Sequence, residues 1–131
     1  TSAGDVNKQI LINSTADGVA IGTGGINQAR IAKAWVHFNG TGTAAIDESY
    51  NISSLTDNGT GLFTINFSTA MANVNYAGGS MTGSGSINSG SAISVRSGVK
   101  STSSMSFSVN YAAGGNGVGD YLHTSIILFG N

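Results

Sequence analysis

The sequence predicts an all-β domain, an antiparallel β-sandwich of about seven to eight strands over residues 31–131. Three features of the chain support this prediction. Hydrophobic side chains alternate with hydroxyl and amide side chains in several segments, and glycine-rich turn signals separate those segments. The chain contains no proline, and no stretch of it supports a helix of ordinary length. Its 131 residues are enough for one domain with its own core.

Residues 1–30 differ from the rest, and we expect them to form an extended N-terminal arm or connector. Within them Val6–Ile12 and Val19–Ile21 have the pattern of short strands. The domain proper would begin with a strand over Ile31–Phe38, which carries hydrophobic residues on both faces. The single tryptophan of the chain, Trp35, lies in the middle of this strand, and we expect it to fill the core.

The alternation of period two is clearest further along the chain. Its best example is a strand in which hydrophobic side chains share one face and serines the other, with Met105, Phe107, Val109 and Tyr111 on the hydrophobic face. Shorter examples contain Tyr50 with Ile52, Phe63 with Ile65 and Phe67, and Ile93 with Val95, and a last strand spans Tyr121–Phe129. The expected core consists of Trp35, Phe38, Phe63, Ile65, Phe67, Phe107 and Val109.

Turns and loops are predicted where glycine gathers. Asn39–Gly42 and Asp57–Gly61 each place Asn-Gly between two strands, as hairpin turns require. Two longer loops, Ala77–Ser91 and Ala112–Asp120, are candidates for binding, because binding residues often lie on loops of a rigid scaffold. The candidate binding residues in and beside these loops are Tyr76, Met81, Ile87, Tyr111, Asn116 and Tyr121. The alternative is that the loops are plain connections and the tyrosines ordinary residues of strand ends.

Charge is scarce in this chain, which excludes several classes of partner. Charged residues make up 8% of the sequence, and the formal net charge is -1 at pH 7. Nucleic-acid binding draws on clustered cations, and the five basic residues here are scattered. No window approaches the run of about 20 apolar residues that a membrane-spanning helix needs. We therefore expect neither a nucleic-acid partner nor insertion into a membrane.

No catalytic residues, metal or cofactor are expected, and the chain is predicted not to be an enzyme. It lacks cysteine, and His37 and His123 do not stand at the spacing of metal ligands. Asp47 and Glu48 are adjacent, so on a strand they would face opposite ways and could not form the carboxylate pair of a glycosidase. A metal held by one histidine per chain, His123, on the axis of a trimer is an alternative that we rank lower.

Three motifs follow one another in order over residues 33–76. They are Lys33–Thr43 (KAWVHFNGTGT), Tyr50–Gly61 (YNISSLTDNGTG) and Phe63–Met71 (FTINFSTAM), with Asn75 and Tyr76 beyond the last. Their order and spacing resemble a domain found at the ends of bacteriophage tail fibre and related virion proteins. The closing strand, Ser125–Phe129, is also similar to that of the family.

This resemblance implies an all-β, non-enzymatic structural domain on a phage virion, which is usually a homotrimer. The matched motifs have the character of scaffold, so the resemblance supplies no ligand and no binding residues. Because permanent interfaces are apolar, we place the trimer contact at the apolar run of the closing strand. This run consists of Ile126, Ile127, Leu128 and Phe129. The expected location is the virion, assembled in the bacterial cytoplasm beside other virion proteins.

Two functions compete at this point. The first is host attachment at a fibre tip, where the two long loops would contact a glycan or protein of the host surface. The second is capsid decoration or a head fibre, in which residues 1–30 would anchor the chain to its neighbours on the particle. A bacterial surface adhesin or a carbohydrate-binding module is a third and weaker reading.

Overall fold

The computed structural model describes residues 11–12, 19–20, 31–83, 91–111 and 117–130. Within residues 1–30 it describes two short strands, β1 (Leu11–Ile12) and β2 (Val19–Ala20), which pair antiparallel. The expected N-terminal arm otherwise lies outside the described residues. Within the described ranges no helix is long and apolar enough to cross a membrane.

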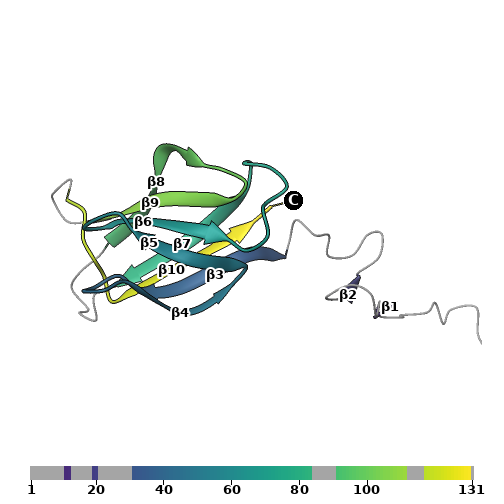
Figure 1. The fold of residues 1–131 in the computed structure, drawn as a ribbon, viewed down its shortest axis with the longest axis horizontal. Coiled ribbons are helices and arrows are strands. Elements are labelled where there is room, and N and C mark those ends of the chain that lie inside the picture. Colours follow the sequence, from purple (N-terminus) through teal and green to yellow (C-terminus); the bar gives the residue numbers. More distant parts are fainter. Residues whose placement is uncertain (1–10, 13–18, 21–30, 84–90, 112–116, 131) are drawn as a thin grey trace, which may run out of the picture.

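Two antiparallel sheets of four strands each make up the domain, which confirms the all-β prediction (Figure 1). The first sheet has the strand order β4-β3-β10-β7 and the second has the order β5-β6-β9-β8. The strands are β3 (Ala32–Asn39), β4 (Ala45–Tyr50), β5 (Ile52–Asp57), β6 (Leu62–Phe67), β7 (Ala77–Gly83), β8 (Ser91–Lys100), β9 (Ser104–Tyr111) and β10 (His123–Phe129). The described residues contain no helix.

The two sheets pack face to face through an aromatic centre. The ring of Phe38 on β3 meets the ring of Phe63 on β6 edge-on, with 5.1 Å between the centroids. The ring of Phe107 on β9 lies 6.1 Å from that of Phe38 and 6.0 Å from that of Phe63. All three side chains are buried, and aromatic rings favour such tilted contacts over flat stacking. The architecture is therefore β-sandwich-like.

The predicted core is confirmed except at Trp35. The buried members of the prediction are Phe38, Phe63, Ile65, Phe67, Phe107 and Val109. The placement of Trp35 was wrong, because the buried positions of β3 are Ala34, Val36 and Phe38. Trp35 alternates with them, so it lies half-buried on the outer face of the first sheet. On that outer face Trp35 stands between Lys33 and His37, so the larger of the two aromatic rings of β3 lies outside the core.

The chain passes from one sheet to the other at Asn51. A single strand through Tyr50 and Ile52 was expected, and this is wrong: Tyr50 ends β4 and Ile52 begins β5 in the opposite sheet. Asn51 has a φ of 57°, in the left-handed region that asparagine tolerates. Its amide nitrogen donates to the carbonyl oxygens of Lys33 at 2.9 Å and Thr69 at 3.0 Å. Its Oδ1 accepts from the Thr69 N–H at 2.7 Å, so one side chain holds the crossover in place.

Substitutions at Asn51 separate the contribution of its side-chain hydrogen bonds to stability from the contribution of its backbone conformation. Asn51→Ala removes three hydrogen bonds and puts a Cβ-bearing residue without local compensation at a positive φ, so we expect a loss of roughly 2–3 kcal/mol. Asn51→Gly removes the same bonds without the backbone cost and should lose about 1 kcal/mol less. Urea unfolding of both variants measures the difference. Equal losses in the two variants would show that the backbone conformation contributes nothing.

Three connections meet at one end of the sandwich, which we call the turn end. The Gly40 N–H donates to the Tyr121 carbonyl at 2.8 Å, which joins the β3–β4 turn to the segment before β10. The Gly61 N–H donates to Asp120 Oδ1 at 2.6 Å, and the Gly61 carbonyl accepts from the Val109 N–H at 2.8 Å. The β5–β6 turn, the end of β9 and the segment before β10 are thereby held together. Both predicted Asn-Gly turns are confirmed as connections between strands.

The strand β3 begins and the strand β10 ends at the opposite end of the sandwich. Ala32, the first residue of β3, is the register partner of Phe129, the last residue of β10. Figure 1 shows the C-terminus at this end and the turn end on the other side of the domain. The sandwich therefore has one end where the chain enters and leaves, and another where its turns gather.

The long loop predicted over Ala77–Ser91 is wrong in its first half. Residues Ala77–Gly83 form β7, which pairs with β10 in unbroken register along one edge of the first sheet. Because three of its seven residues are glycine, this strand shows no alternation of hydrophobic and polar side chains from which it could be predicted. Residues 84–90 lie outside the described residues, as do 112–116 of the other predicted loop. Beyond them Val118 forms an isolated bridge with Asn110.

Candidate functional site

The outer face of the first sheet carries two rows of residues that run across its four strands. Register partners in a sheet lie on the same face, so the pairing places each row directly. The Trp35 row consists of Tyr50 on β4, Trp35 on β3, Ile127 on β10 and Gly79 on β7. The His37 row consists of Glu48, His37, Ser125 and Met81 on the same strands in the same order.

A hollow of about 520 Å³ lies over the Trp35 row, lined largely by Trp35, Ile127, Met81 and Gly79. A Cβ built at Gly79 would have Ile127 Cγ2 as its nearest neighbour, at 3.9 Å, so the missing side chain leaves open space. In the lining of the hollow Met81 and Ile127 expose 74% and 39% of their surfaces, and Tyr50, the partner of Trp35 on β4, exposes 57%. Large hydrophobic side chains gathered at a surface mark a contact face.

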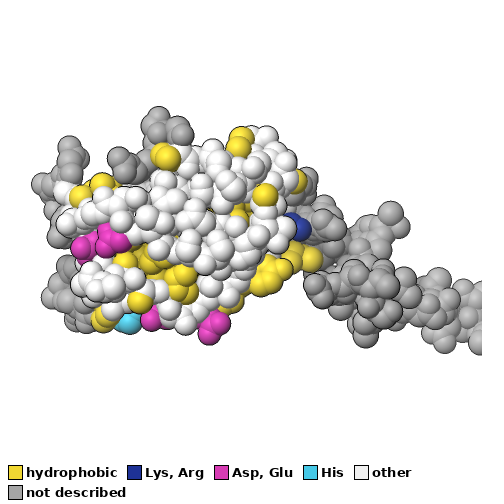
Figure 2. All heavy atoms as spheres, in the orientation of Figure 1, with side chains coloured by type: hydrophobic (Ala, Val, Ile, Leu, Met, Phe, Trp, Pro, Cys, Tyr) yellow, Lys and Arg dark blue, Asp and Glu magenta, His cyan; other side chains and the backbone are white. Residues whose placement is uncertain are grey.

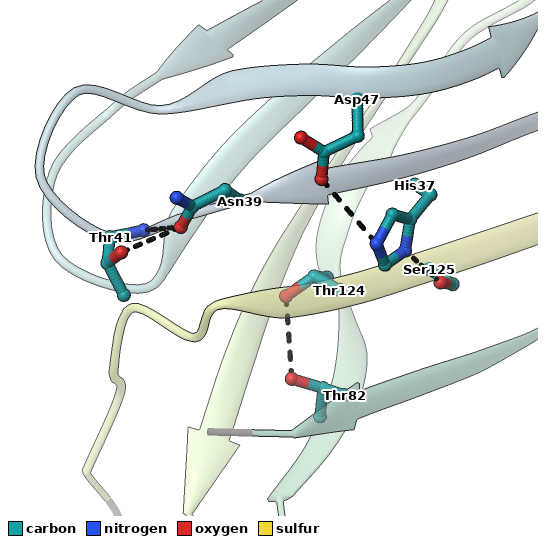
Figure 3. Close-up of polar contacts among 7 residues, drawn as sticks. All are labelled: His37, Asn39, Thr41, Asp47, Thr82, Thr124 and Ser125. Carbon is teal, nitrogen blue, oxygen red and sulfur yellow. Dashed lines mark hydrogen bonds and ion pairs between the residues drawn. The ribbon is translucent and has the colours of Figure 1, made fainter. Parts of the chain in front are cut away.

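A polar cluster centred on His37 occupies the second row (Figure 3). Nδ1 of His37 lies 2.8 Å from the Ser125 hydroxyl, and Nε2 lies 3.5 Å from Asp47 Oδ2. The ring of His123 stacks on the His37 ring, with 5.8 Å between centroids and 16° between planes. The pairing of β3 with β4 shifts register between His37 and Phe38, and this irregularity brings Asp47 beside the imidazole.

The Asp47–His37–Ser125 contacts have the connectivity of a carboxylate, a base and a nucleophile. Ser125, however, lies in the middle of β10 with His37 as its partner on one side and Met81 on the other. The backbone N–H groups around it belong to the two ladders, so they do not form an oxyanion hole. The side chains of His37 and Asp47 are 37% and 51% exposed, which leaves them in water rather than in a dry cavity. The arrangement does not support acyl transfer.

Metal binding has no assembled site in the part of the chain that the structure describes. There, no three His, Cys, Asp or Glu side chains form a group that could hold a metal ion. A second hollow of about 550 Å³ lies beside the sheet crossover, lined in part by Lys33, Tyr50 and Thr69. The Asn51 amide at its wall is already bonded to backbone groups of Lys33 and Thr69, so this side chain holds the crossover and is not available to a ligand.

The structure describes the side chains of three of the six predicted binding residues. Of these three, Tyr76 and Tyr121 are buried and Met81 is exposed. The Tyr76 hydroxyl donates to the Ser101 carbonyl at 3.1 Å, and burial raises the pKa of this phenol. Tyr111 ends β9, and its side chain, like Ile87 and Asn116, lies outside the described structure. Tyr76 is therefore a core residue. This agrees with the alternative interpretation, in which the tyrosines are ordinary residues of strand ends.

The predicted interface run divides between the two faces of β10. Ile126 and Leu128 are 4% and 3% exposed and belong to the core of the sandwich. Ile127 and Phe129 alternate with them on the outer face, where Ile127 joins the Trp35 row. The part of the run that a partner could reach is thus Ile127 with Phe129.

Sequence reasoning missed the outer face as a site. Its signal was present in the two patterns of Ile31–Phe38 and of the closing strand, which are hydrophobic on both faces. The sequence pattern alone could not assign Trp35, His37 and Ser125 to one surface, because that assignment requires the register between β3 and β10.

Fold and surface together define an all-β, β-sandwich-like domain with large exposed hydrophobic side chains on the outer face of its first sheet. No family model, no curated protein and no solved structure matches this chain. Its function therefore has to be argued from its own residues and from the motifs over residues 33–76.

Proposed function

We propose that this chain is a non-enzymatic structural protein of a bacteriophage virion, a tail-fibre-type domain that attaches the particle to its host. The motif order over residues 33–76 supports the class of protein. The observation that carries the attachment role is the division of the sandwich into two ends. A domain held where Ala32 and Phe129 pair presents its turn end outward.

The chemistry of the surface supports the same role. On the face drawn in Figure 2 charged side chains are few, and most surface atoms are neutral side-chain or backbone atoms. Charged residues make up only 8% of the sequence. A surface that depends on hydroxyls and amides has little for salt to screen, so its contacts would vary little between media. The partner would be a glycan or protein of the host surface.

Adsorption of the labelled full-length chain to bacterial cells tests this proposal. We expect it to bind cells of the host strain and to compete with phage particles for them. Thr60 at the turn end and Thr102 at the opposite end are both exposed, so they form a matched pair. Thr60→Glu should lower adsorption several-fold and Thr102→Glu should leave it unchanged. Absence of binding to any strain of a broad panel would contradict attachment.

The exposed apolar face favours one second candidate, a capsid decoration or head-fibre protein whose task is assembly. Deletion of residues 1–30 distinguishes the two. A decoration protein anchored by this segment would be lost from particles, whereas a receptor-binding domain would still adsorb to cells. The resemblance implies a homotrimer, and light scattering of the purified chain distinguishes this state from other assemblies.

A further inference from the structure

The edge strands of the two sheets differ in how they are protected against pairing with a strand of another chain. Exposed edges can pair with a strand of another chain, and proteins prevent this with charges and irregular pairing. Three of the four edge strands follow this rule. They carry Asp47 and Glu48 on β4, Asp57 on β5, and Lys100 on β8. Each of these three also has a shift in its register with the neighbouring strand.

The fourth edge strand, β7, has none of these devices. Its sequence is AGGSMTG, with no charge and no proline, and it pairs with β10 without a shift over all seven residues. Residues 77–81 are exposed, including Ser80, which points toward the inner side of the sheet. A flat, neutral and regular edge of this length is a template for another strand.

We propose that two copies of this chain pair through β7, antiparallel and about a two-fold axis at Ser80, into one continuous eight-stranded sheet. Under this symmetry Ser80 faces the partner's Ser80, and Met81 faces the partner's Gly79. The same register sets Ala77 against the partner's Gly83. The proposal goes beyond the proposed function, and it replaces the three-fold assembly that the resemblance implies with a pair.

The register matches an exposed side chain to an open space. Met81 is 74% exposed, and Gly79, two residues before it on the same face, leaves the hollow beside Trp35 and Ile127 open. Facing residues of antiparallel strands lie on the same face of the sheet. Each Met81 therefore lies over the partner's Gly79 and fills its hollow, and a flexible thioether suits an irregular apolar space. A polar ligand would find few partners among these apolar lining side chains.

The size of the contact also fits a stable pair. Seven facing residues in an antiparallel ladder form about six to eight hydrogen bonds, within the range of about 10 ± 5 in a typical interface. Both strands are neutral, so no like charges oppose each other across the axis. On the second sheet the edge strand β8 keeps Lys100 and its irregular register, so only the first sheet continues into the partner.

Substitutions at Ser80 test the pair directly, because the two-fold axis places each Ser80 side chain opposite the Ser80 side chain of the other copy. Light scattering of the full-length chain at micromolar concentration should give twice the mass of 13.1 kDa. Ser80→Lys and Ser80→Glu each place like charges directly opposite and should each give the mass of one chain. An equimolar mixture of the two variants should return to the mass of two chains. Val74→Lys, at an exposed apolar residue outside β7, is the control and should stay paired.

Each other outcome overturns the pair. A wild-type chain that is a monomer, or a trimer whose mass is unchanged by both Ser80 substitutions, excludes pairing at β7. Monomeric variants that do not recover on mixing exclude the axis at Ser80, provided that far-ultraviolet circular dichroism shows both variants folded. A failed pair leaves the adsorption experiments with Thr60 and Thr102 unaffected, so the two proposals can fail separately.

Discussion

Phe38→Ala should destabilise the domain by about 3–5 kcal/mol, the range for removing a large aromatic side chain from a core. Phe38 is fully buried and lies against Phe63 and Phe107 of the opposite sheet. Its removal opens a cavity at the place where the two sheets meet. Small domains are stable by only about 5–15 kcal/mol, so this change alone consumes a large part of the total.

Tyr50 provides the comparison for this variant on the outer face of the same sheet. It is 57% exposed, so Tyr50→Ala should cost less than about 1 kcal/mol. Urea unfolding followed by circular dichroism measures both values. Losses of similar size would mean that the sheets do not pack on the face that carries Phe38.

Gly61→Ala is expected to cost about 3–4 kcal/mol, from a strained backbone together with overpacking. Gly61 has a φ of 64°, and a Cβ there would lie 2.9 Å from the Val109 carbonyl oxygen and closer still to the segment at Gly119. The residue also bonds through its N–H to Asp120 and through its carbonyl to Val109. No flexible side-chain end is available to give way, so the junction at the turn end must open.

Gly59, two residues earlier in the same turn, separates the two causes. It has a φ of 115°, but a Cβ there would meet nothing within 4 Å. Gly59→Ala therefore carries a backbone cost alone, about 1–2 kcal/mol. Thermal unfolding of both variants tests the difference. If Gly61→Ala were no worse than Gly59→Ala, the close approach of the Gly119 segment would be contradicted.

The sequence predicted the strands in which one face alone is hydrophobic. In β6 and β9 large side chains alternate with Ser, Thr and Asn, so a single pattern determines both the strand and its buried face. The turn over Asp57–Gly61 was equally predictable from its own residues, and within it Asp57 Oδ1 accepts from the Gly59 N–H at 2.8 Å. Local features of this kind need no knowledge of the partner strands.

What the sequence could not reveal depends on pairing between distant residues. Ile31–Phe38 has hydrophobic residues on both faces, and only the sheet order decides that Phe38 points inward and Trp35 outward. The strand β7 lacks an alternation because it is built on glycine, and it is a strand through its pairing with β10. The two rows of the outer face join strands from both ends of the chain, so their existence follows from register alone.

The place of β10 has a consequence for biosynthesis. It lies between β3 and β7, so it is the only link between the β3–β4 hairpin and β7 within the first sheet. Until β10 has left the ribosome, that sheet exists as two unconnected parts, and the neutral β7 lacks the strand with which it pairs. The nascent chain therefore stays open to wrong pairing until His123–Phe129 is available, and a stop codon before His123 would remove an inner strand of the sheet.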